Sequence, residues 1–360
     1  MFLFDLKCLI FVRLDKVSLD FFEFNFIKKH ENHSHHDIIY ATKGEIRMNE
    51  TSRRILDHFQ VRKTKKQKEE FRKYIIHELD QYGYCPSIQH KGINNNIIIG
   101  NIEKAKIFCT AHYDTQAVLP FPNLIVPNNL FGLILSQLAI IICVLILIFF
   151  MNIFLIQLFV WIGLFKNIEL NIASSISWLI IMIWMLFGKA NKHTANDNTS
   201  GIITIIESAI KLPEDLRDEV CFVLFDNEEL GLLGSSAFAK EYKEYVKNKL
   251  IINFDCVSDG NDIFFFPTKQ IKNDQSKHEN IINAFASTDY TRVHINKGFG
   301  FYPSDNFNFK YAYGVCSLKK GLFYYLDRIH TSRDIIFNEE NIELLSEGVC
   351  KLVKTAHTSR

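Results

Sequence analysis

Apolar and polar positions divide this chain of 360 residues into two kinds of segment. In most of it, short apolar runs of strand length alternate with segments whose apolar residues recur at helical spacing. We expect strands over 96–99, 106–111, 220–225, 250–254, 263–266 and 314–318, and helices over 52–83, 200–212, 230–246, 279–286 and 339–354. This alternation is typical of an α/β fold with a mostly parallel central sheet flanked by helices on both faces.

The second kind of segment is long and uncharged. No Asp, Glu, Lys, Arg or His occurs over residues 115–165, and residues 170–188 are uncharged again. Because a bilayer span needs about 20 apolar residues, we expect an inserted transmembrane helical hairpin with spans at about 131–151 and 169–188. Residues 153–165 either lie in the membrane interface or extend the first helix. A hydrophobic dimerisation arm is the alternative to a hairpin in lipid.

Charge and composition exclude several classes of protein. The 41 basic and 40 acidic residues give a net charge of +1, which excludes a nucleic-acid binder driven by bulk charge. Only 16 Gly and 7 Pro are present, so a collagen-like or linker-like chain is excluded as well. None of the eight cysteines forms a C-x-x-C pair and most stand in apolar runs, which favours reduced, buried thiols over a disulfide frame.

Residues 1–47 follow no pattern of the remaining chain, and we expect a non-native or disordered extension there. Lys43-Gly44-Glu45 can be encoded by a purine-rich ribosome-binding sequence just ahead of Met48. We therefore expect translation to start at Met48.

Polar residues of the types that serve in catalysis and metal binding occur directly after predicted strands. This is the edge of the sheet at which α/β proteins form their sites. Two histidines and three carboxylates stand out as metal ligands: His112, Asp197, Glu229, Asp255 and His330. This set is too large for one tetrahedral zinc ion but suits two ions that share a bridging carboxylate. A neighbouring carboxylate that is not a ligand, Glu228, can serve as a base, and Asp114 can accept the His112 N–H and orient the ring.

The motifs that carry a resemblance follow in order along the chain: Thr110-Ala111-His112-Tyr113-Asp114-Thr115, Ala195-Asn196-Asp197-Asn198-Thr199-Ser200-Gly201, Asp226-Asn227-Glu228-Glu229-Leu230-Gly231, Asn253-Phe254-Asp255 and His330-Thr331. Together they resemble the co-catalytic di-zinc aminopeptidases of peptidase family M28, here as a bacterial-type member with an inserted membrane hairpin. The resemblance covers roughly residues 52–360 without the insertion. It implies a zinc-exopeptidase-like fold with a mixed, mostly parallel sheet.

The resemblance also implies a role for each matched residue. His112 and Asp255 would hold one zinc ion, Glu229 and His330 the other, and Asp197 would bridge both. Glu228 would be the general base, and the peptide bond after Asp197 is often cis in this family. Ser304 and Asp305 resemble the family's substrate-side loop.

One position departs from the family pattern. Some relatives have a tyrosine before the last histidine that helps to hold the oxyanion, and Ile329 stands there. Zinc and another donor, such as Arg328 or a tyrosine from elsewhere, would have to take over this role.

A shared metal cluster constrains the hairpin. His112 and Asp197 flank the insertion, so both of its ends must lie on one side of the membrane and the number of spans must be even. We therefore expect one discontinuous zinc peptidase domain, 48–120 with 190–360, around a membrane insertion over 121–189. Lys189 and Lys192 favour the cytoplasm for the catalytic side of an integral cell-membrane protein.

The leading function is therefore a membrane-anchored zinc aminopeptidase with two Zn²⁺ ions. Its partners would be peptide substrates and, through residues 131–188, the lipid bilayer. A glutaminyl-cyclase-like or deacylating zinc enzyme is one alternative, and a non-catalytic receptor-like member of the family is another. The full two-metal ligand set argues against both.

Overall fold

The computed structural model describes residues 38–40, 48–163 and 170–358. At its centre lie four parallel strands in the order β5 (Val220–Phe225), β4 (Ile107–His112), β6 (Leu250–Phe254) and β9 (Ala312–Lys320). Every residue of β4 and β5 is buried. Continuous apolar strands of this kind occur where helices cover both faces of a sheet.

Antiparallel pairs at both edges make the whole sheet mixed. One edge is formed by β3 and β2, and the other by β7 with β8, while β10 pairs with β9. These strands are β2 (Ser87–Lys91), β3 (Asn94–Ile99), β7 (Asp262–Pro267), β8 (Arg292–Ile295) and β10 (Tyr324–Tyr325). Separately, β1 (Ile39–Tyr40) pairs in parallel with β11 (Ile336–Phe337). The predicted α/β class is confirmed.

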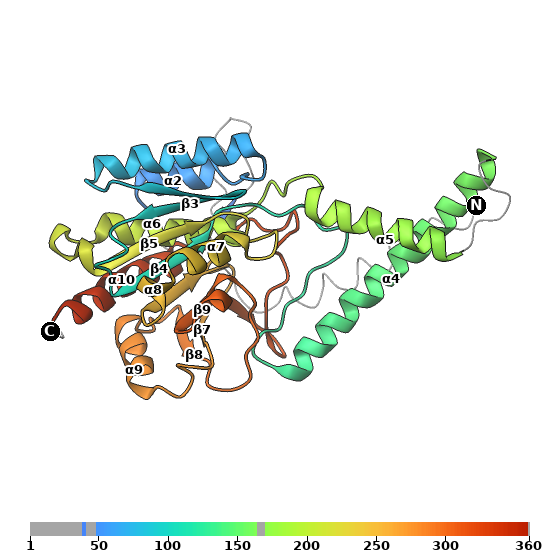
Figure 1. Ribbon diagram of the computed structural model, residues 1–360. Helices are drawn as coiled ribbons and strands as arrows, with labels where there is room; N and C mark the ends of the chain where they lie inside the picture. Colours follow the sequence, from blue (N-terminus) through green and yellow to red (C-terminus); the bar gives the residue numbers. More distant parts are fainter. Residues whose placement is uncertain (1–37, 41–47, 164–169, 359–360) are drawn as a thin grey trace.

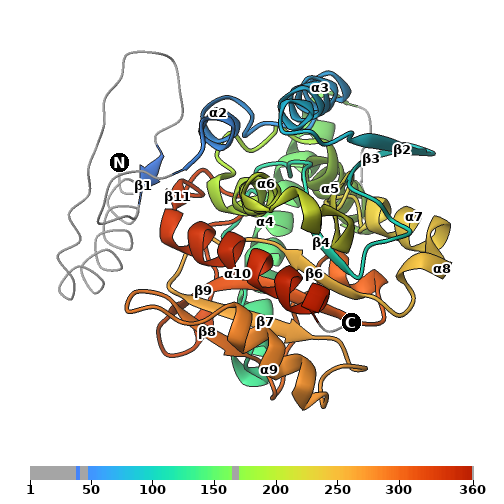
Figure 2. The same ribbon diagram turned by 90° about the vertical axis from the view of Figure 1, so that its left-hand side faces the viewer.

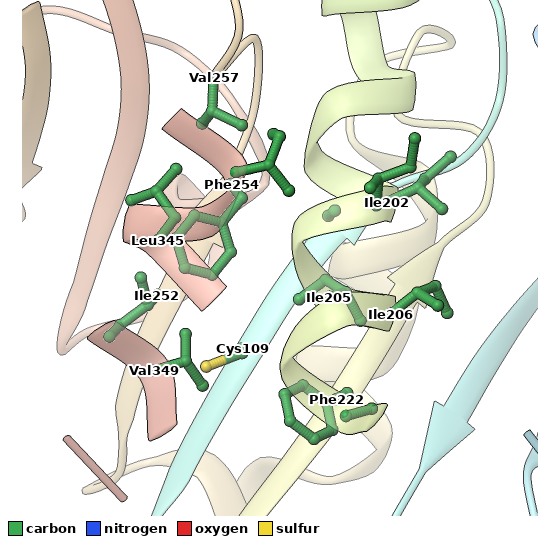
Figure 3. Packing of buried hydrophobic residues seen from close by; sticks show 14 of the residues in the cluster. Cys109, Ile202, Ile205, Ile206, Phe222, Ile252, Phe254, Val257, Leu345 and Val349 are labelled. Carbon is green, nitrogen blue, oxygen red and sulfur yellow. The ribbon is translucent and has the colours of Figure 1, made fainter. Parts of the chain in front are cut away.

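Helices cover the two faces of the sheet because alternate strand residues point to opposite sides. Cys109 of β4 packs with Ile205 of α6 (Gly201–Lys211) and Val349 of α10 (Glu339–Thr358), as Figure 3 shows. Its neighbour Phe108 instead packs on Phe238 of α7 (Leu233–Glu241), with ring centroids 6.3 Å apart. In Figure 2, α6 and α10 accordingly lie on one side of the central strands and α7 and α8 (Lys243–Val246) on the other.

The predicted single helix over 52–83 is wrong in its continuity. The structure has α2 (Glu50–His58) and α3 (Lys65–Gln81), because Thr64 and Gln67 form a capping box that starts a new helix. Between the two helices the Arg62 side chain is fully buried, and its guanidinium donates to the carbonyl oxygens of Phe59 and Tyr113. Strands β2 and β8 were not expected, and the remaining helix is α9 (Gln275–Ala284).

The uncharged insertion forms two helices, α4 (Leu130–Trp161) and α5 (Leu170–Phe187). Figure 1 shows both extending from the same side of the domain. Helix α4 has 32 residues and thus a length of about 48 Å. Residues 153–161 continue α4, so the extension of the first helix is the interpretation that the structure supports. Among the described residues, α4 alone is long and apolar enough to cross a membrane, and α5 is shorter.

In this helix pair, polar side chains are buried between the helices and large apolar side chains are exposed on the outside. Asn152 of α4 donates to Ser174 Oγ of α5 at 2.9 Å and accepts from Ser177 Oγ at 2.6 Å. Asn152 and Ser177 are buried, whereas large apolar side chains of α4 such as Leu138 and Phe149 are exposed. Strands on both sides of the insertion, β4 before it and β5 and β6 after it, belong to one sheet. The expectations for residues 1–37 and 41–47 concern positions outside the described ranges.

Candidate active site

The candidate ligands lie together at the carboxyl edge of the parallel strands. His112 is the last residue of β4, Asp255 follows β6 directly, and Glu229 follows β5. Asp197 lies in a short helical turn over 195–200, just ahead of α6, and His330 follows β10. Parallel strands bring these positions together because their carboxyl ends share one edge of the sheet.

Asp197 stands between the two histidines. Its Oδ1 lies 3.3 Å from His112 Nε2, and its Oδ2 lies 2.8 Å from His330 Nε2. The carboxylate is buried, and the peptide bond between Asp197 and Asn198 is cis, as the motif implied. One carboxylate therefore faces two separate imidazoles with different oxygens.

A further carboxylate completes the group around each histidine. Asp255 Oδ1 lies 3.5 Å from His112 Nε2, and Glu229 Oε1 lies 3.4 Å from His330 Nε2. Three sets of residues have their possible ligand atoms within 4.8 Å of one another: His112 with Asp197 and Asp255, Asp197 with Glu229 and His330, and His112 with Glu228 and Glu229. The first two sets share Asp197.

Asp114 fixes the loop that carries the two glutamates. Its Oδ1 accepts from the Glu228 backbone N–H at 2.9 Å, and its Oδ2 accepts from the Glu229 backbone N–H at 3.2 Å. Its Oδ1 also lies 3.5 Å from His112 Nδ1. Asp114 thus connects the end of β4 to the loop after β5.

Asp334 fixes the turn that carries Asp197. Its two carboxylate oxygens accept from the backbone N–H groups of Asn196 and Asp197, at 2.8 and 2.9 Å. Burial raises the pKa of Asp334 well above its usual range, and the nearby Asp197 adds to this. No motif in the sequence marks Asp334, and its place four residues after His330 is the only signal.

The charge of the site is strongly negative. Six carboxylates lie near one another, buried or half-buried: Asp114, Asp197, Glu228, Glu229, Asp255 and Asp305. Burial raises the pKa of Glu228 well above its usual range, and neighbouring carboxylates add to this while His112 opposes it. Burial also opposes protonation of both histidines, but the surrounding carboxylates outweigh it and raise their pKa values.

This donor set fits divalent cations. The positive groups that interact with these carboxylates are the two histidines, Lys63, Lys68 and Arg62, whose pKa burial lowers to about 9. A buried excess of negative charge is relieved either by protonation of the carboxylates or by bound cations. Imidazole and carboxylate groups are also the ligands that zinc accepts.

The predicted substrate-side residues have different surroundings. Ser304 is buried and accepts from Asn253 Nδ2 at 2.9 Å. The Asp305 carboxylate is buried, and burial raises its pKa to about 7. Arg328 lies against Asp259, with Nη1 2.7 Å from Oδ1.

A comparison of the sequence with models of protein families gives a match for part of the chain. The model described as peptidase family M28 matches residues 185–352. These residues belong to peptidase family M28. The match includes four of the five candidate ligands and confirms the membership that the sequence motifs predicted. No curated protein matches the chain.

Several solved structures share the fold of this chain at low sequence identity. A glutaminyl cyclase of Porphyromonas gingivalis is 14% identical with a TM-score of 0.51, over 85% of this chain and 96% of that one. A Zn-dependent exopeptidase of Parabacteroides distasonis is 13% identical with the same TM-score, over 84% and 94% of the two chains. The LapA aminopeptidase of Legionella pneumophila is 15% identical, over 84% and 67%, with a TM-score of 0.48.

Replacing Asp334 tests whether this carboxylate positions Asp197. Asp334→Asn leaves one acceptor oxygen for two N–H groups and turns an NH₂ donor toward the second. We expect zinc affinity to fall by about 10- to 100-fold, with the circular dichroism spectrum unchanged. Chelator competition measures the affinity, and Asp80→Asn on the exposed surface of α3 is the matched control. Equal affinities in the two variants would contradict the role.

Proposed function

We propose that this protein is a membrane-anchored, zinc-dependent aminopeptidase that removes N-terminal residues from peptides. The observation that carries the proposal is the position of Asp197 between His112 and His330, with Asp255 and Glu229 on its two sides. Membership of residues 185–352 in peptidase family M28 supports hydrolysis of peptides. A second, closely placed ligand set supports two ions rather than one.

The ligands divide naturally between two ions. His112 and Asp255 would hold one, Glu229 and His330 the other, and Asp197 would contact both with its separate oxygens. When bound, such ions polarise a substrate carbonyl and lower the pKa of a water molecule. The protein's part is to hold these side chains in place, which Asp114 does from β4 and Asp334 does from the loop after His330.

Glu228 is the proposed proton carrier. It would take the proton of the attacking water and pass it to the leaving amine. Its backbone N–H is held by Asp114, and its side chain lies close enough to His112 to belong to one candidate ligand set. The raised pKa of Glu228 in the cation-free cluster reflects burial first and the neighbouring carboxylates second. Bound cations would lower it again.

The complete double ligand set favours this function over its alternatives. A cyclase that uses a single zinc ion needs one of the two sets, and a non-catalytic relative needs neither. The similarity to the Porphyromonas gingivalis cyclase shows a shared fold and does not decide between activities. All five proposed ligand residues and Glu228 lie at the same edge of the sheet.

Membrane anchoring by α4 and α5 is supported by their inverted surface. Polar Asn152 and Ser177 lie in the helix–helix contact, where lipid-embedded helices place such residues, while the outer surface is apolar. At the end of α5, Lys63 Nζ donates to the Leu186 carbonyl at 2.9 Å, and Lys189 and Lys192 follow. The positive-inside tendency then supports a cytoplasmic catalytic domain.

Glu228→Gln tests the catalytic assignment. The change removes the proton carrier and leaves the ligands, so we expect unchanged zinc content and a loss of turnover of roughly 10²–10⁴-fold. Hydrolysis of aminoacyl-anilides by the purified, zinc-loaded chain is the measurement, with Glu347→Gln on α10 as the control. Near-normal turnover in Glu228→Gln would refute the assigned role. A parent protein that cyclises glutaminyl peptides and cleaves no anilide would favour the cyclase.

Cysteine labelling tests the topology. An impermeant thiol reagent applied to intact cells should label a cysteine at Asn167, which lies between α4 and α5 in the sequence, and should not label one at Lys192. Labelling of the parent chain provides the blank. The reverse pattern would place catalysis outside the cell. Release of the protein by high-salt and alkaline washes would instead support a dimerisation arm.

A further inference from the structure

Exposed apolar side chains continue from the first turn of α4 onto the catalytic domain. Leu322, at the turn between β9 and β10, is 92% exposed, and Phe131 in the first turn of α4 is 68% exposed. Phe301 and Phe307, next to the substrate-side residues Ser304 and Asp305, are each almost half exposed. Together with Phe323, these four residues form what we term the apolar rim.

Direct contacts connect the parts of the apolar rim. The rings of Phe131 and Phe323 have centroids 6.4 Å apart, which fixes the β9–β10 turn against the start of α4. The rings of Phe301 and Phe307 lie 5.8 Å apart. The Phe301 N–H donates to the carbonyl of Pro127, three residues before α4 begins, at 2.8 Å. The rim is therefore held to the base of α4 at two places.

The rim also borders the metal site. The Phe307 N–H donates to the Ser304 carbonyl at 3.0 Å, next to the buried carboxylate of Asp305. The chain that leads from β4 to α4 passes His330, whose carbonyl accepts from the Leu119 N–H at 3.0 Å. The hairpin thus leaves the domain at the edge of the sheet that carries the ligands, and in Figure 1 both of its helices project from that one side.

Basic residues surround the bases of both helices. Lys189 and Lys192 are exposed just after α5, and Lys320 is exposed two residues before Leu322. Lysines at this level face anionic lipid headgroups, and apolar side chains between them enter the interface. Phe and Leu are likewise among the residues that interfacial segments bury at the boundary between headgroups and acyl chains.

We propose that the apolar rim rests in the interfacial layer of the bilayer, so that the active site opens toward the lipid surface. The preferred substrates are then peptides whose free N-terminus emerges from the membrane surface, because the rest of the chain is amphipathic or carries an acyl group. This inference rests on the proposed aminopeptidase function and adds its substrate class. The occupant of the rim is lipid, since the rim continues the apolar surface of α4.

Photo-crosslinking tests the lipid contact. Benzoylphenylalanine in place of Leu322, in the full chain reconstituted into phosphatidylglycerol–phosphatidylethanolamine vesicles, should gain the mass of one phospholipid on irradiation. The same residue in place of Ile282, an exposed position on α9, should not. No lipid adduct at Leu322, in a protein that stays in the vesicle pellet, would overturn the proposal. An adduct between two copies of the chain would overturn it in favour of a dimer contact.

A pair of peptide substrates tests the proposed preference for membrane-associated peptides. Two peptides share one N-terminal sequence, and only one carries a C-terminal alkyl chain. In vesicles the parent should cleave the anchored peptide with a kcat/KM at least roughly 10-fold higher, because membrane binding raises its effective concentration. Leu322→Asp should reduce this preference and leave cleavage of a soluble aminoacyl-anilide unchanged, whereas Ile282→Asp should preserve both.

The results of these experiments distinguish a failure of the proposed substrate class from a failure of the proposed aminopeptidase function. Equal rates for the two peptides, with the anilide still cleaved, would overturn the substrate class and leave the aminopeptidase standing. A parent that cleaves neither peptide nor anilide would overturn the function and the substrate class together. The crosslink at Leu322 would then still decide whether the rim contacts lipid.

Discussion

One carboxylate that must face two imidazoles constrains this structure more than any other contact. Asp197 presents Oδ1 to His112 and Oδ2 to His330, residues that come from opposite sides of the hairpin and from distant parts of the chain. The backbone N–H of Asp197 donates to Asp334, and the side chain of the next residue, Asn198, donates to the Phe254 carbonyl. The parallel strands serve this geometry by ending at one edge. The negative charge gathered there favours the binding of cations.

The same constraint determines how the hairpin is placed. Because β4 ends at His112 and the chain returns to Asp197 soon after α5, both ends of the insertion lie at the site edge of the sheet. An apolar insertion at this point brings its exposed surface close to the candidate ligands, and the buried polar contact of Asn152 with Ser177 keeps the two helices together. In the proposed function, the position of the insertion therefore couples membrane anchoring to substrate access.

The sequence was informative wherever a residue's role follows from its place after a strand. His112, Asp255 and Glu229 could be found because apolar runs mark the strands and polar residues mark their ends. The break between α2 and α3 also has a local signal, because Thr64 and Gln67 have the spacing of a capping box, but the helical spacing of the apolar residues hid it. Asp334 and the rim residue Leu322 have no such local signal. Their roles come from contacts across the fold, which no periodicity records.

The zinc content of the purified full chain tests the central claim most directly. Elemental analysis should give two zinc ions per chain for the parent and at most one for Asp197→Ala, because that change removes a ligand from both ions at once. Asp289→Ala, an exposed position, should retain two. One ion per parent chain, or an unchanged content of two in Asp197→Ala, would contradict a shared bridging carboxylate.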